Sequence, residues 1–175
     1  MTGPVIDRPN DETATAWWFL DTLMKEHNNA EDMKTVVLEM TLPVGHAPPL
    51  HAHEDLDDTW YILEGEMAVQ CGDETTVVGA GHWVSMPRGV PHRFRVMGER
   101  EARILLVHDN ATFRDFVRAL ARPAESLVVP PDPQIPAIPE LVKVGGEHGL
   151  TVLGAPMTPE EAEAIVTQAV AASSR

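Results

Sequence analysis

The sequence contains little cysteine, few basic residues and no long hydrophobic run, and each scarcity excludes a class of protein. Cys71 is the only cysteine among 175 residues, so no disulfide can form within the chain. Lys and Arg total 13 against 27 Asp and Glu, and the net charge of -14 would repel nucleic acid and anionic membranes. No run approaches 18 apolar residues, and residues 1–10 lack the basic and apolar regions of a signal peptide. We therefore expect a cytoplasmic protein whose partners include neither nucleic acid nor a membrane.

Two further patterns are missing from a chain that has the length of one domain. Helical segments of crossover length do not separate the strand-like segments, which argues against a doubly wound parallel sheet. No G-x-S-x-G sequence surrounds Ser85, so a serine nucleophile of the hydrolase type has no support.

Short segments with strand character dominate residues 34–108, and turns that contain Gly or Pro separate them. The predicted strands are 34–42, a strand that carries His51 and His53, 58–63, 67–71, 75–78, 82–86, 92–96 and 102–108. Short antiparallel strands without crossover helices predict an all-β fold, either a sandwich or a barrel.

The N-terminal region contains an apolar segment at residues 16–25, which is compatible with a helix or a strand. A β-branched run at 34–42 follows an Asn-rich turn at 27–32, and this order favours a hairpin of two strands. We therefore expect one continuous strand over 16–25. Residues 1–13 are polar, contain two prolines and are expected to form an arm.

After Asn110 the pattern changes from strand to helix. Apolar side chains recur at the i, i+3, i+4 and i+7 spacing of an amphipathic helix: Phe113, Phe116, Val117 and Leu120. Asn110 or Thr112 would cap this helix, which is expected to pack on the outside of the barrel.

Prolines then punctuate residues 123–139, which are expected to run extended. Pro139 suits the first turn of a short helix that continues to about Val144. The sequence Thr158-Pro159-Glu160-Glu161 is a capping box, which predicts a helix that includes residues 162–171.

The stretch that begins at His51 carries the strongest chemical signal in the chain. His51 and His53 project from the same face of a strand, with Cα atoms roughly 6.6 Å apart. His92 follows a turn rich in Gly and Pro, where a strand could return it toward this pair. Three imidazoles and a carboxylate from the acidic residues after His53 suit a first-row divalent metal. The histidines without such spacing are expected to be ordinary and partly exposed: His27, His46, His82, His108 and His148.

Two groups of residues resemble the two motifs of the cupin superfamily. The first group is Gly45, His51, His53, Asp58 and Gly65, and the second is Gly81, Pro87, Gly89 and His92. The core of the resemblance covers residues 34–108, and the flanking segments look like the single-cupin proteins grouped with bacterial quercetin dioxygenases. The resemblance implies a double-stranded β-helix barrel: residues 1–110 would form the arm and barrel, and residues 111–175 a C-terminal extension with a helix, a Pro-rich linker and a helical tail.

By this resemblance, one divalent transition metal (Ni, Co, Fe, Mn, Cu or Zn) is bound by His51, His53, Asp58 and His92. Asp58 stands where the family usually has Glu, and Val96 stands where it usually has Asn. Because Asp is one methylene shorter than Glu, Asp58 would bind the metal directly, bind it through water, or act as a catalytic general base. The alternative is a metal-free cupin in which the histidines only form hydrogen bonds inside the barrel.

Alternation along the strands predicts an apolar substrate pocket beside this site. Counting by two from Asp58 places Trp60 and Ile62 on the inner face, and counting from His92 places Phe94 and Val96 there. These side chains would suit a flat aromatic or alicyclic molecule.

The resemblance implies an enzyme, a quercetinase-like dioxygenase that consumes dioxygen. Its substrate would be a hydroxylated aromatic or polyketide-like small molecule, and the protein would form a homodimer. Two alternatives use the same scaffold. One is a non-oxidative enzyme of natural-product metabolism: an isomerase, cyclase, dehydratase or decarboxylase. The other is a small-molecule-binding cupin without turnover.

Overall fold

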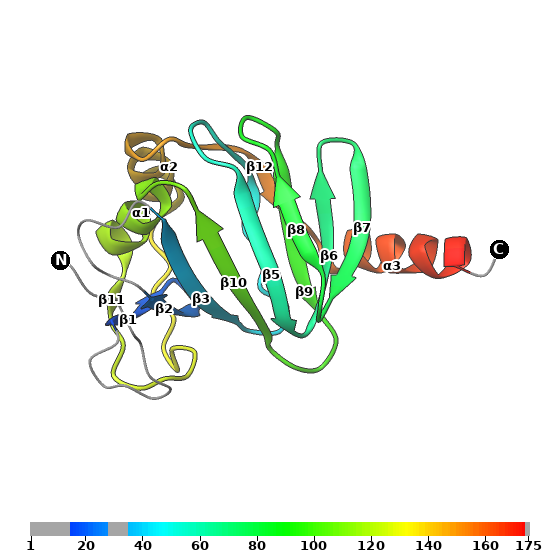
Figure 1. The fold of residues 1–175 in the computed structure, drawn as a ribbon, viewed down its shortest axis with the longest axis horizontal. Helices are drawn as coiled ribbons and strands as arrows, with labels where there is room; N and C mark the ends of the chain where they lie inside the picture. Colours follow the sequence, from blue (N-terminus) through cyan, green and yellow to red (C-terminus); the bar gives the residue numbers. More distant parts are fainter. Residues whose placement is uncertain (1–14, 28–34, 174–175) are drawn as a thin grey trace.

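The computed structural model describes residues 15–27 and 35–173, which form two facing antiparallel sheets (Figure 1). Helices α1 (Thr112–Leu120) and α2 (Ile138–Glu147) lie together on one side of the sheets. Helix α3 (Pro159–Ser173) extends away on the opposite side. The predicted all-β barrel with a C-terminal helical extension is therefore confirmed. The predicted arm at 1–13 and most of the Asn-rich turn lie outside the described residues.

Strand pairing divides the barrel into a larger and a smaller sheet, with the orders β11-β1-β2-β3-β10-β5-β8 and β12-β4-β9-β6-β7. The larger sheet contains β1 (Thr15–Phe19), β2 (Thr22–His27), β3 (Val36–Leu42), β5 (Asp58–Glu64), β8 (Trp83–Met86), β10 (Ala102–His108) and β11 (Arg122–Pro123). The smaller sheet contains β4 (Pro49–His53), β6 (Glu66–Cys71), β7 (Glu74–Gly79), β9 (His92–Met97) and β12 (Leu150–Pro156). Neighbouring strands are antiparallel in both sheets, as the Gly- and Pro-containing turns predict.

The core lies between the sheets because buried and half-buried side chains alternate along the strands. In β10, Ala102, Ile104, Leu106 and His108 are buried, and the residues between them are half-buried. Strands β3 and β9 show the same alternation. Full burial of one aliphatic side chain contributes about 1.5–3 kcal/mol, so these inward faces supply most of the stabilisation of the barrel.

The single strand predicted over 16–25 is wrong, because these residues form a tight hairpin. Strand β1 ends at Phe19 and β2 begins at Thr22, with Leu20 in a left-handed conformation at φ 56°. The Thr22 hydroxyl donates to the Phe19 carbonyl oxygen over 2.7 Å and closes the turn. The turn contains no Gly, Asn or Pro, and Asp21 alone is a weak turn signal within an apolar segment. The predicted pairing of this segment with the following strand is confirmed, since β2 pairs with β3.

The C-terminal elements follow the predicted order, with one longer helix and two additional strands, β11 and β12. Helix α2 continues past Val144 through two glycines to Glu147, and a Cβ at Gly145 would lie 3.1 Å from the Leu150 side chain. Glycine at this position therefore lets the helix approach strand β12. Strand β12 was not predicted as a strand, and it pairs with β4 at the edge of the smaller sheet.

The capping box at the start of α3 is confirmed by two reciprocal hydrogen bonds. The Thr158 backbone N–H donates to Glu161 Oε2 over 2.8 Å, and the Glu161 backbone N–H donates to Thr158 Oγ1 over 3.2 Å. Both bonds satisfy amide groups that have no partner within the helix.

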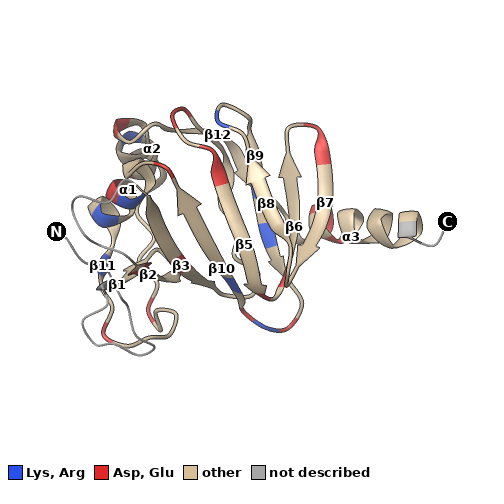
Figure 2. Ribbon diagram, viewed as in Figure 1, with Lys and Arg blue, Asp and Glu red and all other residues tan. Residues whose placement is uncertain are grey.

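Charged residues occur mainly at strand ends, in loops and on the helices, and the middle of most strands carries none (Figure 2). The interior is therefore apolar apart from a small set of buried polar residues: Thr22, Glu26, His51, His53, Asp58, His92 and His108. Within residues 15–27 and 35–173, no helix is long and apolar enough to cross a membrane.

Replacement of Gly65 by alanine is expected to destabilise the barrel more than the same change at Gly98. Both glycines have positive φ, 86° and 78°, so each change incurs the cost of a left-handed residue, about 1 kcal/mol. A Cβ at Gly65 would also lie 2.7 Å from the Cα of Ala102, whereas a Cβ at Gly98 meets nothing within 4 Å. Urea unfolding should therefore show a loss that is larger by about 1 kcal/mol or more for Gly65→Ala. Equal losses would contradict this close approach.

Candidate metal centre

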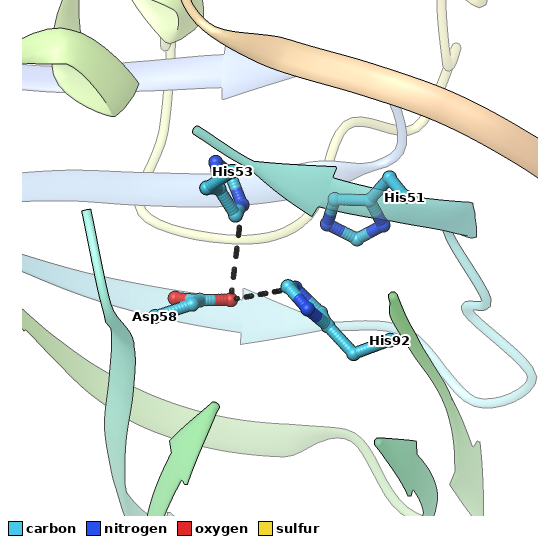
Figure 3. A group of neighbouring side chains, drawn as sticks. All are labelled: His51, His53, Asp58 and His92. Atoms are coloured by element: carbon cyan, nitrogen blue, oxygen red, sulfur yellow. Dashed lines mark ion pairs between the residues drawn. The ribbon is translucent and has the colours of Figure 1, made fainter. Parts of the chain in front are cut away.

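Four side chains from three strands meet inside the barrel (Figure 3). His51 and His53 come from β4, Asp58 from β5 and His92 from β9, and all four are buried. Their potential ligand atoms, one from each residue, all lie within 4.8 Å of one another. The residues of the two sequence motifs are therefore brought together from both sheets, because each lies on the inner face of its strand.

Backbone carbonyl groups fix the orientation of two of the histidines. His51 Nδ1 lies 2.7 Å from the Pro49 carbonyl oxygen, and His92 Nδ1 lies 2.9 Å from the Val90 carbonyl oxygen. Since a carbonyl oxygen only accepts, each Nδ1 carries a proton, and the lone pair of the neutral ring lies on Nε2. Metal-binding histidines are commonly held by such a hydrogen bond from the nitrogen that does not bind the metal.

The Nε2 atom of His92 is buried and has no hydrogen-bond partner among the residues that the structure describes. Asp58 Oδ2 lies 3.5 Å from this atom and 4.0 Å from His53 Nε2. A ring lone pair that faces a carboxylate is unfavourable unless a proton or a cation lies between them. Ligand atoms that share one ion at about 2.0–2.2 Å lie roughly 3–4 Å apart. The four residues therefore fit a divalent metal, and the shorter side chain of Asp58 still reaches the histidines.

Burial keeps two of the cluster histidines neutral. Desolvation, together with the nearby His92 ring, lowers the pKa of His51 to about 4. Desolvation also lowers the pKa of His53 to about 3, although the charge of Asp58 opposes this shift. Neutral imidazole is the form that binds metals, so these two rings need not lose a proton at neutral pH.

Asp58 is held by two N–H donors that belong to neither sequence motif. Trp60 Nε1 donates to Asp58 Oδ1 over 2.7 Å, and His108 Nε2 lies 3.0 Å from the same oxygen. Burial alone would raise the pKa of Asp58, but the hydrogen bond from His108 and the neighbouring His92 and His53 rings hold it well below its usual value. Asp58 is therefore an anion whose Oδ1 is engaged and whose Oδ2 faces the histidines.

The expectation that His108 is an ordinary, partly exposed histidine is wrong. Leu106 pairs with Trp60 in the ladder between β10 and β5, and this register brings His108 beside Asp58 two residues further along. Its side chain is consequently buried. The alternation along the predicted strand 102–108 places His108 on the inner face, and this signal could have identified it. The remaining histidines lie outside the cluster, half-buried or exposed: His27, His46, His82 and His148.

A cavity of about 590 Å³ opens beside the cluster, which is a size typical of small-molecule sites. His51, His53 and Asp58 contribute to its wall, and most of the other lining side chains are apolar. Polar groups are therefore concentrated at a few places on an apolar surface, as in sites that orient a small ligand.

Two of the four predicted pocket residues line this cavity. Trp60 and Phe94 do so, with ring centroids 4.8 Å apart. Ile62 and Val96 do not, because core side chains cover them and leave 0% and 1% of their surface exposed. Alternation fixes the face of the sheet on which a residue lies, but depth within the barrel decides whether it reaches the cavity.

Elements outside the central strands close the cavity. The turn between β1 and β2, helices α1 and α2, and strand β12 all contribute lining residues. The Phe113 ring lies 5.7 Å from the His53 ring and 5.5 Å from the His108 ring, measured between centroids. Helix α1 lies beside the sheets, outside the barrel, and its aromatic face covers the metal-binding cluster and the cavity.

Comparison with known proteins agrees with this geometry. The sequence model of a family described as "Cupin domain" matches residues 38–108, which contain the four cluster residues. A solved structure from Thermotoga maritima, described as a predicted oxalate decarboxylase, is 22% identical and aligns with a TM-score of 0.52 over 59% of this chain and 99% of that chain. Residues 38–108 of this chain therefore match a cupin domain in sequence, and the chain has the cupin fold. At this level of identity, the likeness to the solved cupin structure shows the fold alone.

Two further relatives share part of the cupin sequence. Quercetin 2,3-dioxygenase from Bacillus subtilis is 28% identical over 79 residues, which are 45% of this chain and 23% of that enzyme. A protein from Methanocaldococcus jannaschii, described as uncharacterised, is 30% identical over 78 residues, which are 45% of this chain and 62% of that protein. The chain therefore spans less than two thirds of the length of either relative.

The metal-free protein is expected to lose stability as the pH falls from 6.5 to about 4. In this range the unfolded chain protonates His51 and His53, whereas burial keeps both neutral in the folded protein. Because the unfolded state then binds more protons, each histidine raises the unfolding equilibrium constant about tenfold for each pH unit lost. Urea unfolding in the presence of a chelator should show this slope, and His51→Gln should reduce it by about half. An unchanged slope in the variant would mean that His51 is already protonated in the folded state.

Proposed function

We propose that the protein is a metal-dependent cupin enzyme and that its reaction is a quercetinase-like dioxygenation of a hydroxylated aromatic or polyketide-like molecule. One observation carries the proposal: four residues suited to a divalent metal lie beside an apolar cavity of about 590 Å³. A flat apolar molecule with one ionisable hydroxyl matches both parts of this site. The similarity to quercetin 2,3-dioxygenase supports the reaction, and it covers 23% of that enzyme.

His51, His53, Asp58 and His92 would hold the metal through three nitrogen atoms and one oxygen atom. When bound, the metal would stabilise the ionised hydroxyl of the substrate as a Lewis acid and support dioxygen chemistry. Iron, cobalt, nickel, copper, zinc and manganese all accept ligands of this kind, so metal supply and site geometry would decide which is used.

Asp58 is suited to accept the proton of the substrate hydroxyl. Its Oδ1 already accepts hydrogen bonds from Trp60 and His108, so the carboxylate cannot turn without losing both. Oδ2 is the oxygen that faces the histidines, so it would accept this proton when it does not bind the metal. A general base placed in this way contributes roughly 10²–10⁴-fold to a reaction rate.

Aromatic side chains would position the ring of the substrate. Phe94 and Trp60 present their rings to the cavity, and Phe113 lies over the histidines. This apolar lining would exclude water from the hydroxyl group that is to be ionised and would strengthen its interaction with nearby charges.

A non-oxidative cupin enzyme, such as an isomerase, cyclase, dehydratase or decarboxylase, is the second candidate. It is favoured by the hydrogen bond between Asp58 and His108, because a buried carboxylate and imidazole could accept and return a proton without an oxidant. Consumption of dioxygen distinguishes this candidate from the dioxygenase.

The protein purified without a chelator or an affinity tag is expected to contain about one equivalent of a divalent transition metal. His92→Ala should weaken metal binding by more than about 100-fold, since loss of a residue that merely orients a ligand already costs roughly 10–100-fold. Elemental analysis gives the content, and competition with a chromophoric chelator gives the affinity. His82→Ala is the control, because His82 is exposed and contacts the Gly79 backbone. Equal affinities of the two variants would contradict the proposed ligands.

Reconstituted protein is expected to consume dioxygen with at least one flavonol, as measured with an oxygen electrode. Asp58→Asn should retain metal through the three histidines and lose about 100-fold or more in turnover, because it removes the proposed base. Full activity of this variant would eliminate that role. Product formed without oxygen uptake would favour the non-oxidative enzyme, and binding without any product would favour a small-molecule-binding protein.

A further inference from the structure

We propose that Asp21 and His46 form a second polar subsite in the cavity, which binds a hydroxyl group at the end of the substrate far from the metal-binding cluster. The preferred substrates would then be elongated aromatic molecules with hydroxyl groups at both ends. This inference rests on the proposed function, because it names the shape and polarity of the molecule that the same cavity accepts.

The two side chains form a defined pair on the cavity wall. His46 Nδ1 lies 2.8 Å from Asp21 Oδ1, and both residues line the cavity. Because the ionised carboxylate only accepts, Nδ1 donates to it, and the lone pair of the neutral ring lies on Nε2. The His46 ring also lies against Phe94, with centroids 5.7 Å apart, so contacts on two sides orient it. Nε2 and the second oxygen of Asp21 are therefore acceptors for a ligand hydroxyl.

The register of the smaller sheet separates this pair from the metal-binding cluster. His51 pairs with His92 on β9, whereas the Val96 backbone N–H donates to the His46 carbonyl oxygen over 2.9 Å. These two levels are four residues apart on strand β9, which corresponds to roughly 13 Å of backbone. Phe94 occupies the middle of this interval. A ligand with two or three connected rings could lie over Phe94 and place a polar group at each end.

The pair stands out because the cavity wall is otherwise apolar. Among the described lining residues outside the metal-binding cluster and its partner Trp60, the polar side chains are Asp21, His46 and Thr22. The Thr22 hydroxyl donates to the Phe19 carbonyl oxygen, which leaves Asp21 and His46 as the polar residues of this wall that are available to a ligand. Burial would raise the pKa of Asp21, but its hydrogen bond with His46 holds the pKa below its usual value, so the carboxylate stays ionised. A single hydrogen bond of this kind contributes only modestly to stability, whereas the pair is suited to recognition of a polar group.

The backbone around Asp21 supports a role in binding. Leu20, the preceding residue, is the one non-glycine residue with positive φ in the described part of the chain. A bulky residue in this conformation is strained, and such strain is concentrated at binding sites. The turn that carries Asp21 lies outside residues 38–108, the range matched by the cupin family, whereas His46 lies inside it, so the subsite joins the flanking structure of this chain to the central strands.

Binding of three probes tests the subsite: 3-hydroxyflavone, which carries one hydroxyl, and 3,7- and 3,4′-dihydroxyflavone, which carry a second hydroxyl at opposite ends of the molecule. Quenching of tryptophan fluorescence would give each dissociation constant, with and without added metal. The protein is expected to bind at least one dihydroxylated probe about 3- to 10-fold more tightly than 3-hydroxyflavone, which is the effect of one added hydrogen bond. Asp21→Asn and His46→Leu should abolish this preference and leave the affinity for 3-hydroxyflavone within about twofold.

His27→Gln provides the matched control, because His27 pairs with Glu39 over 3.4 Å in the same sheet and does not line the cavity. This variant should keep the preference. If His46→Leu fails to fold, as judged by thermal unfolding, the nearly isosteric Asp21→Asn provides the same test. Equal affinity for all three probes, binding of none, or a preference that survives both substitutions would overturn the subsite. A preserved preference without any dioxygen uptake would overturn the proposed reaction alone.

Discussion

A carboxylate buried between two apolar sheets is stable only when its charge is matched, and Asp58 is matched from both sheets. Trp60 and His108, on the larger sheet, donate to Oδ1, while His53 and His92, on the smaller sheet, face Oδ2 across the position that a bound cation would take. Burial of an unpaired charge costs on the order of several kcal/mol. The two sheets must therefore keep the separation and register that bring these groups together. The same arrangement places Trp60 on the cavity wall. The metal-binding cluster and the cavity wall therefore both depend on matching the charge of Asp58.

The barrel and the metal-binding cluster can be predicted from the sequence because the necessary information is local. Gly- and Pro-containing turns mark most strand ends between β5 and β10, and alternation then assigns each side chain to a face. The motif spacing places His51, His53, Asp58 and His92 on inner faces, where the structure brings them together. The turn after β1 is not predicted in this way, because the hydrogen bond from Thr22 that closes it forms only in the folded chain.

Local sequence patterns do not predict which residues of neighbouring strands pair with one another. A register shift between Arg103 and Ile104 changes which residues of β5 face β10, and no feature of either strand alone shows it. His108 meets Asp58 only because of that register. The same limit explains Ile62 and Val96, whose inward orientation is predictable but whose depth below the cavity depends on how the two sheets pack.

The metal-binding residues and part of the cavity wall come from different ranges of the chain, and this limits what related proteins can share. Residues 38–108, matched by the cupin family, carry the cluster, whereas Asp21, Phe113, Leu141 and Val152 of the cavity wall lie outside that range. Cupins that share only the central strands can therefore share the metal-binding residues and still accept different molecules. A molecule that leaves a polar group of the cavity without a hydrogen bond binds less tightly. A polar pair on an otherwise apolar wall therefore restricts substrates more strongly than the shape of the cavity alone would. The substrate of this protein should accordingly be sought by matching hydroxyl positions to the flanking elements, with the cluster fixing only one end of the molecule.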